Sequence, residues 1–223
     1  MELTRTATHQ PKPFEEDFFR KVFQHPLGEP SLAIYLHQQE LVGARWILEL
    51  PIHSWSEKIH QHAREEMKHA EILHAEAARL RTSVAPGRAH QMNLVGAQLF
   101  EITEKYMRGI FEASLKAIIQ VSGVTKITGD QKRFVNYYVL SFLLERRIMK
   151  TYPYIARFAN DERLIQTAKK IIRDEKDHLS EVMEGIEKVV TPYGLDLTAV
   201  SSFEEAAYRQ FTESFLGILE AAP

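Results

Sequence analysis

The sequence contains no cysteine, and this absence excludes several kinds of chemistry at once. Without thiols there are no disulfides, no thiolate zinc sites, no iron–sulfur clusters and no cysteine nucleophiles. Any metal that the chain binds must therefore be held by glutamate, aspartate or histidine. Charge of one sign is lacking too, because 28 basic residues nearly balance 30 acidic ones. This balance creates no field that would attract nucleic acid, so nucleic acid is not an expected partner.

Glycine and proline are scarce, with 10 and 9 residues among 223. A β fold with many turns needs more of both, whereas 44% hydrophobic residues are enough for one sizeable core. The longest apolar run, VNYYVLSFLL at 135–144, is too short to span a membrane, and the N-terminus lacks the apolar segment of a secretory signal. We therefore expect one compact cytoplasmic domain without a membrane span.

Apolar residues recur at every third or fourth position through most of the chain, which is the period of an amphipathic helix. The pattern predicts an all-α fold that follows a partly loose N-terminal extension over 1–30. Capping-box spacing marks two helix starts, at Ser54 with Glu57 and at Ser202 with Glu205. The predicted helices span residues 31–50, 54–82, 91–121, 131–158, 162–190 and 203–220.

Four Glu-x-x-His motifs occur, and three of them lie in the second predicted helix. Turning each residue by about 100° separates the buried motifs from the solvated ones. Glu66 and His69 fall within the apolar stripe of the second helix. Glu175 and His178 fall within the stripe of the fifth helix. The other two motifs lie off the stripe and are interpreted as solvated: Glu57 with His60, and Glu71 with His74.

The first and fourth predicted helices each carry a single acid on the apolar stripe, Glu40 and Glu145. Residues that face each other across an antiparallel hairpin must lie equally far from its turn. The midpoint of Glu40 and Glu66 falls in the turn between the first two helices. The midpoint of Glu145 and Glu175 falls in the turn between the fourth and fifth. Each pair should therefore share one level, about 20 Å from its turn at 1.5 Å per residue.

Four carboxylates that meet in an apolar interior are too costly as bare anions. Two divalent cations would balance their four negative charges, and two neutral imidazoles would complete the ligand shell. Carboxylate oxygen and imidazole nitrogen suit iron or manganese. The sequence therefore predicts a site for two iron ions, with manganese or a mixed pair as alternatives. Its six predicted ligands are Glu40, Glu66, His69, Glu145, Glu175 and His178.

Three neighbours are candidates for a supporting shell around these ligands. Glu65 and Asp174 each precede a ligand glutamate, where they can fix the tautomer of a metal-bound histidine, and solvated helix acids are the alternative. His62 lies one turn before Glu66 on the same stripe. We assign it to the edge of the core, with an extra ligand and a proton relay as alternatives.

Two tyrosines are candidates for a catalytic role. Tyr138 and Tyr152 lie two turns to either side of Glu145 on the same helix. Both are suitable core residues, and a phenol at either position can also hydrogen-bond a carboxylate ligand or activated oxygen. The terminal helix, 203–220, carries more apolar surface than a free helix would display. It is expected to cap the bundle or to form a homodimer interface.

The ligand set resembles that of the ferritin-like superfamily of dinuclear carboxylate proteins, especially its oxidase and oxygenase branch. The resemblance covers about residues 31–190. It implies a four-helix bundle of two antiparallel hairpins, joined by the crossover helix 91–121, in one domain over 31–220. It also implies that a diiron site uses O2 and an external electron donor to oxidise a small, apolar organic substrate.

Local similarity within this superfamily points to aldehyde-deformylating oxygenases, which have similar text at EMKH (66–69) and DEKDHL (174–179). Ribonucleotide reductase small subunits are disfavoured, because Leu73 stands where they carry a radical tyrosine. Manganese catalases share the bundle and much of the ligand set, so peroxide detoxification stays open as an alternative. A non-catalytic module that stores metal or only builds structure is the third hypothesis.

Overall fold

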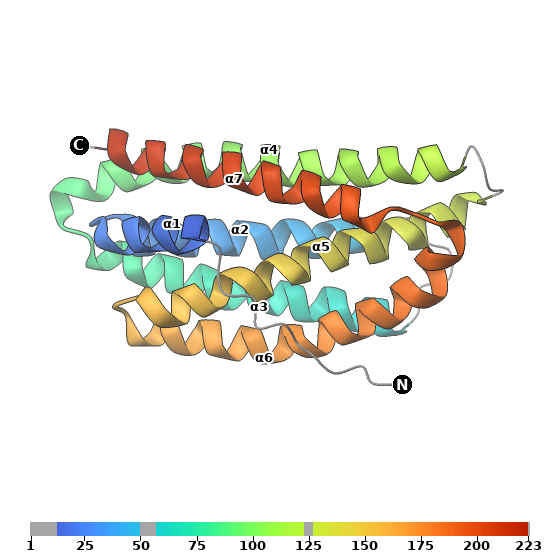
Figure 1. The fold of residues 1–223 in the computed structure, drawn as a ribbon. Helices are drawn as coiled ribbons and strands as arrows, with labels where there is room; N and C mark the ends of the chain where they lie inside the picture. The colour runs from blue at the N-terminus through green and yellow to red at the C-terminus, as the bar shows by residue number, and fades with distance from the viewer. Residues whose placement is uncertain (1–12, 50–56, 123–126, 223) are drawn as a thin grey trace.

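The structure is a computed structural model that describes residues 13–49, 57–122 and 127–222 (Figure 1). All regular elements within these ranges are helical, which confirms the predicted all-α class. The long helices are α1 Pro13–Gln24, α2 Gly28–Glu49, α3 Glu57–Ser83, α4 Ala89–Ser122, α5 Gly129–Phe158, α6 Glu162–Gly185 and α7 Leu197–Ala221. Within the described ranges, no helix is both long and apolar enough to cross a membrane.

Two pairs of helices form the frame of the molecule. Helix α2 packs along α3, and α5 packs along α6. The long α4 connects the two pairs in the chain, packs against α2 and α5, and carries α7 along its length (Figure 1). Residues 50–56, which include Ser54 of the predicted capping box, lie outside the described residues, and α3 begins at Glu57.

The N-terminal region is more ordered than the loose extension predicted over 1–30. From residue 13 the chain forms α1, and α2 already begins at Gly28. Phe18 and Phe19 of α1 are buried in the main core. Phe18 meets Phe215 of α7 edge to face, with ring centroids 5.5 Å apart. The aromatic residues of α1 thus provide the apolar surface that holds this helix against the rest of the molecule.

Helix α7 begins at Leu197, six residues before the start predicted for helix 203–220. The side chain of Asp196 caps it by accepting hydrogen bonds from the backbone N–H groups of Thr198 and Ala199. The capping box predicted at Ser202 and Glu205 is therefore wrong, because both residues lie inside the helix. An acidic N-cap at the preceding turn satisfies the first N–H groups, so the helix starts there.

The predicted helix 162–190 is divided in two by a change of helical type. Asp161 caps α6 and accepts a hydrogen bond from the backbone of Leu164 at 2.9 Å. The helix ends at Gly185, and Ile186–Val190 continue as a π-helix. A Cβ atom at Gly185 would lie 1.9 Å from the ring of Tyr138, so only glycine lets α6 approach α5 so closely here.

Candidate metal centre

Four glutamates, one each from α2, α3, α5 and α6, meet in the interior of the molecule. They are Glu40, Glu66, Glu145 and Glu175, and none is more than 5% exposed. Each lies on the buried face of its helix; in α3, for example, Ile59 and Leu73 flank Glu66 on that face and are equally buried. The apolar stripes that drive helix packing therefore also carry the acids inward.

Two histidines lie one turn beyond the acids of α3 and α6. His69 Nδ1 is 2.9 Å from Glu175 Oε1, and His178 Nδ1 is 2.9 Å from Glu175 Oε2. Side chains on a helix lean toward its N-terminus, so a histidine three residues after a glutamate reaches the same level. The carboxylate of Glu175 consequently lies between the two imidazoles, with one oxygen toward each.

The outer nitrogens of both imidazoles meet acids from the opposite helix. His69 Nε2 lies 3.2 Å from Asp174 Oδ2, and His178 Nε2 lies 2.7 Å from Glu65 Oε2. The two contacts cross the α3–α6 interface in opposite directions. An acid in this position holds the proton on the outer nitrogen and leaves the lone pair of the inner nitrogen for a metal.

The potential ligand atoms fall into two buried groups that share Glu66. One group comprises His62, Glu66, Glu145 and His178, and the other comprises Glu40, Glu66, His69 and Glu175. Within each group, one ligand atom per residue lies within 4.8 Å of all the others. Each group can hold a metal ion, so the cluster offers positions for two ions. The structure thus brings together all six predicted ligands and adds His62.

Several polar atoms in the cluster have no hydrogen-bond partner among the described residues. They are Oε2 of Glu40 and of Glu145, together with Oε1 of Glu66 and of Glu175 and Nδ1 of His69, which lie close to other cluster atoms without the geometry of a hydrogen bond. A buried polar atom without a partner is costly, and a cation placed among these atoms would remove that cost. Carboxylate oxygens and imidazole nitrogens without sulfur are donors that suit iron or manganese. The residues present therefore fit the predicted metals.

Burial and mutual repulsion shift the pKa values of the acids apart. Burial, with the charges of Glu66 and Glu175, raises the pKa of Glu40 well above its ordinary value. Burial and the charge of Glu175 raise the pKa of Glu145 in the same way. Burial also acts to raise the pKa of Glu66, but hydrogen bonds from His178 and His62 outweigh it and lower that pKa.

The two imidazoles opposite these acids attract protons. Burial alone would lower the pKa of His178, but its hydrogen bonds to Glu175 and Glu66 raise it to about 11. The pKa of His69 is also raised, because contact with Glu175 outweighs burial. The raised pKa values of Glu40, Glu145, His69 and His178 favour their protonated forms, so metal ions compete with protons for these groups.

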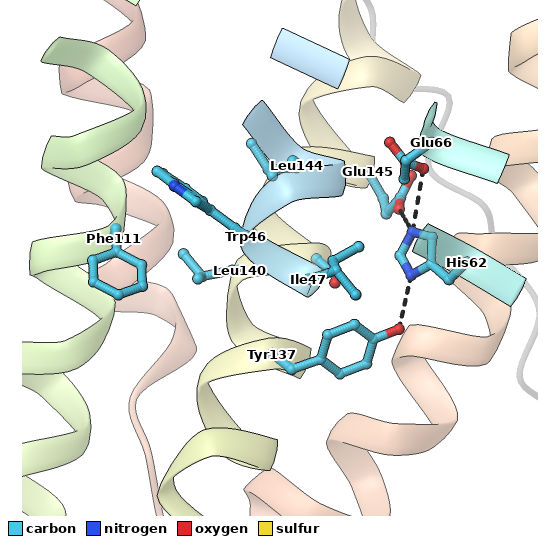
Figure 2. Close-up of a pocket in the computed structure, with 11 residues that line it drawn as sticks. Trp46, Ile47, His62, Glu66, Phe111, Tyr137, Leu140, Leu144 and Glu145 are labelled. Carbon is cyan, nitrogen blue, oxygen red and sulfur yellow. Dashed lines mark hydrogen bonds and ion pairs between the residues drawn. The ribbon is translucent and has the colours of Figure 1, made fainter. Parts of the chain in front are cut away.

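His62 lies closer to the acids than the core-edge position predicted for it. Its Nε2 atom is 2.9 Å from Glu145 Oε1 and 3.2 Å from Glu66 Oε1 (Figure 2). Its Nδ1 atom is 2.7 Å from the hydroxyl of Tyr137. The imidazole therefore spans the distance between two candidate ligands and a buried phenol.

The two predicted tyrosines have different surroundings. Tyr152 donates a hydrogen bond from its hydroxyl to Glu40 Oε1 at 2.5 Å, and both residues are buried. Tyr138 is half-buried, and its ring packs against Gly185 and against Tyr137, with the two tyrosine ring centroids 4.9 Å apart. The structure brings Tyr152 to the cluster, whereas Tyr138 packs beside it.

Tyr137, rather than Tyr138, reaches the cluster by way of His62, although the sequence pattern did not indicate it. At about 100° per residue, Tyr138 lies near the stripe of Glu145, while Tyr137 lies about 80° away from it. Its long side chain nevertheless extends from the edge of α5 to His62 on α3. A buried histidine needs a partner for each ring nitrogen, and this requirement was the signal that could have indicated Tyr137.

The Glu-x-x-His motifs that were interpreted as solvated lie on the outer side of α3. Glu57, His60, Glu71 and His74 are all exposed. The Glu-x-x-His spacing therefore occurs on both faces of α3, and only the pair on the buried face belongs to the cluster. The spacing alone, without the helical periodicity of the apolar residues, would have indicated the wrong ligands.

A small apolar cavity of about 30 Å³ adjoins the cluster between α2, α4 and α5 (Figure 2). His62, Glu66 and Glu145 line its inner end. Trp46 and Phe111, whose ring centroids lie 5.3 Å apart, line its outer end (Figure 2). Gly43, Ile47, Tyr137, Leu140, Ser141 and Leu144 complete the lining. This space suits a molecule of the size of O2 or water rather than a long organic chain.

No model of a known protein family, no curated protein and no solved structure matches the chain. The side chains themselves therefore carry the assignment. Two buried groups of carboxylates and imidazoles, which share Glu66 and adjoin an apolar cavity, form a candidate dinuclear metal centre.

Proposed function

We propose that this chain is a ferritin-like, O2-dependent diiron oxidoreductase. In this proposal α2, α3, α5 and α6 form a four-helix bundle that holds two iron ions. The observation that carries the proposal is the pair of buried ligand groups that share Glu66. An inward glutamate from each of two helices, together with Glu-x-x-His from each of the other two, is the ligand pattern of ferritin-like diiron proteins.

Charge balance supports two divalent ions rather than one. Four ionised carboxylates carry four negative charges, and two divalent cations neutralise them while the imidazoles stay uncharged. With one ion, the remaining two carboxylates would have to keep protons to avoid a strongly unfavourable buried charge. The carboxylate of Glu175, with one oxygen toward each imidazole, would help to hold the ions beside both histidines.

When bound, a pair of ferrous ions supplies the electrons that reduce O2 and thereby the power to oxidise an organic substrate. The side chains of this chain orient and protect that chemistry. Tyr152 fixes the carboxylate of Glu40 through its hydroxyl. Asp174 and Glu65 hold the imidazoles in the orientation that a ligand requires. An external electron donor is needed for repeated turnover.

The apolar cavity supports a small, apolar reactant beside the acids. Trp46 and Phe111 line the cavity with apolar rings, and apolar surroundings limit the water beside a reactive oxidant. Both rings are partly exposed, so a substrate that enters from this side passes them. A Cβ atom at Gly43 would lie 3.8 Å from Leu144 and 4.0 Å from Glu66, so a larger side chain there would fill this space.

A second candidate function is the disproportionation of hydrogen peroxide at a dimanganese centre. The cavity is small enough to suit peroxide as well as O2. Carboxylates outnumber imidazoles in one of the two ligand groups, and oxygen donors suit manganese. A protein that holds metal without turnover is the third candidate, and it differs from both in consuming neither O2 nor peroxide.

Anaerobic loading with Fe²⁺ followed by exposure to O2 tests the leading proposal. We expect two ferrous ions per chain, and rapid O2 consumption that is coupled to their oxidation. Loading with Mn²⁺ and addition of hydrogen peroxide forms the competing arm, in which rapid O2 evolution would favour the peroxide function. Iron-loaded protein that consumes no O2 would end the oxidoreductase proposal.

A matched pair of variants on α3 separates the cluster from nonspecific metal binding. Glu66→Ala removes the carboxylate that both ligand groups share, whereas Glu71→Ala removes an exposed acid from the same helix. We expect Glu66→Ala to lose both ions, and Glu71→Ala to keep two ions with unchanged O2 consumption. Equal metal content in the two variants would contradict the proposed site.

A further inference from the structure

All three buried histidines near the acids share one arrangement. In each imidazole one nitrogen faces the carboxylates, and the other meets an oxygen outside the group. For His69 and His178 the outer oxygen belongs to a carboxylate, and for His62 it belongs to the hydroxyl of Tyr137. His62 therefore has the complete set of contacts that characterises a ligand histidine.

The three imidazoles differ in which nitrogen faces inward, and helix geometry explains the difference. Side chains lean toward the N-terminus of their helix, so His69, three residues after Glu66, leans toward that acid. It can present its near nitrogen, Nδ1. His62 lies four residues before Glu66 and leans away from it, so only its far nitrogen, Nε2, extends to the acids. Figure 2 shows this nitrogen directed at Glu66 and Glu145.

We propose that His62 is a metal ligand, which makes the centre one of four carboxylates and three imidazoles. This inference rests on the proposed dinuclear site. It places His62 Nε2 with Glu66, Glu145 and His178 around one ion, as their mutual distances within 4.8 Å allow. The proton of the imidazole is then on Nδ1, which donates it to the oxygen of Tyr137.

The tautomer of His62 determines what its inner nitrogen can do. Both ring nitrogens face oxygen atoms: Tyr137 on one side, two carboxylates on the other. With its proton on Nε2, the ring donates to a carboxylate, accepts from the hydroxyl of Tyr137 and only supports the fold. With its proton on Nδ1, the ring donates to Tyr137, and its lone pair at Nε2 faces the carboxylates, which is favourable only when a cation lies between them.

The consequence is that the two metal positions are inequivalent. One position has two imidazoles and two carboxylates, and the other has one imidazole and three carboxylates, with Glu66 counted in both. His62, Glu66 and Glu145 also line the apolar cavity, so the nitrogen-rich position is the one that faces it. Metal titration of the wild-type protein should therefore show two binding steps of unequal affinity.

Anaerobic Fe²⁺ titration of His62→Ala tests the assignment, with His60→Ala as a matched control for an exposed histidine on the same helix. We expect His62→Ala to retain one tight ion and to bind the second more than about 100-fold more weakly, since loss of an outer partner alone costs 10–100-fold. Tyr137→Phe should weaken the same step by about tenfold. His60→Ala should match the wild type.

Chemical rescue separates a ligand from a residue that only supports the fold. Added imidazole should restore the second Fe²⁺ step in His62→Ala, because it can occupy the space left beside the cavity. Pyrrole, a ring of similar shape without a free lone pair, should not restore it. Rescue by both rings, or a wild-type titration curve for His62→Ala without additive, would overturn the assignment of His62.

A measurement on the wild-type chain keeps the test independent of any variant that fails to fold. In dicobalt(II) protein, proton NMR should show three hyperfine-shifted, exchangeable ring N–H signals, one for each ligand imidazole. Two such signals would overturn the role of His62 and leave the dinuclear site intact. Wild-type protein that binds no second ion would overturn the proposed function and this inference together.

Discussion

At the scale of single residues, the buried glutamates differ in the side chains that contact their carboxylates. Glu40 accepts a short hydrogen bond from Tyr152, while Glu145 meets the imidazole of His62. Glu175 lies between two imidazoles. Six ligand positions follow from helical periodicity alone. The partners Tyr137 and Tyr152 depend on how far a phenol extends across the interface, which periodicity does not describe.

Removal of the Tyr152 hydroxyl should weaken metal binding without unfolding the protein. Tyr152→Phe deletes the hydrogen bond that orients Glu40, and loss of an outer partner typically costs about 10–100-fold in metal affinity. Tyr154→Phe is the control, because the buried hydroxyl of Tyr154, two residues further along α5, has no partner among the described residues. Calorimetric Fe²⁺ titration of both variants measures the difference, and equal affinities would argue against an orienting role for Tyr152.

Metal loading should release protons and strengthen with rising pH. The pKa values of Glu40, Glu145 and His69 are raised, and that of His178 reaches about 11, so protons compete with metal for all four groups. Because raised pKa values keep these groups protonated in acid, affinity is lowest there and increases as the pH rises. At pH 6 we expect a net release of protons when metal binds, measured by pH-stat titration. A release near zero would show that other groups bind the metal.

At the scale of helices, a buried arginine on α5 is the centre of a polar network that connects α1, α4, α5 and α7. Arg147 of α5 contacts Glu15 of α1 at 2.8 Å and both carboxylate oxygens of Glu204 of α7 at 2.7–2.8 Å. Its guanidinium lies 3.9 Å from the ring centroid of Tyr208, and Tyr106 of α4 donates to Glu204. Such a group is expensive to break, because removal of one partner leaves buried charges unpaired.

Arg147→Ala should therefore destabilise the fold by about 3–5 kcal/mol, measured by urea denaturation. The adjacent Arg146 pairs with Glu205 at a partly exposed position, and Arg146→Ala should cost no more than about 1 kcal/mol. Similar losses for the two variants would mean that burial of the Arg147 network does not matter to stability. The local sequence offers two neighbouring arginines and does not show which one is buried, because burial depends on the distant helices α1 and α7.

The ends of the helices were predicted less well than their positions, because neighbouring residues compete to cap a helix. Asp196 and Ser202 both have side chains that can cap a helix, and the earlier one does so. The apolar period of α1 was present in the sequence. Its segment was nevertheless expected to be partly loose. Its packing partners, such as Phe215, lie almost two hundred residues away, so the local sequence did not reveal them. Local patterns thus predict where helices form, whereas the choice between neighbouring caps and the contacts with distant helices are harder to predict.

At the scale of the whole molecule, the level of the acids was predictable because a hairpin relates two residues through their distance from one turn. The side of the molecule on which α4 and α7 pack was not predictable, since several apolar helix faces could have received them. The cavity bordered by Trp46 and Phe111 results from that packing and could not be derived from any one helix. The proposed substrate class therefore depends on tertiary structure, whereas the proposed ligands do not.

Anomalous diffraction from crystals of the iron-loaded protein, recorded on either side of the iron absorption edge, tests the central claim most directly. The account predicts two anomalous peaks per chain. One should lie between Glu66, Glu145 and His178, and the other between Glu40, Glu66 and His69. A single peak, or peaks confined to exposed acids, would contradict a dinuclear centre in the interior of this protein.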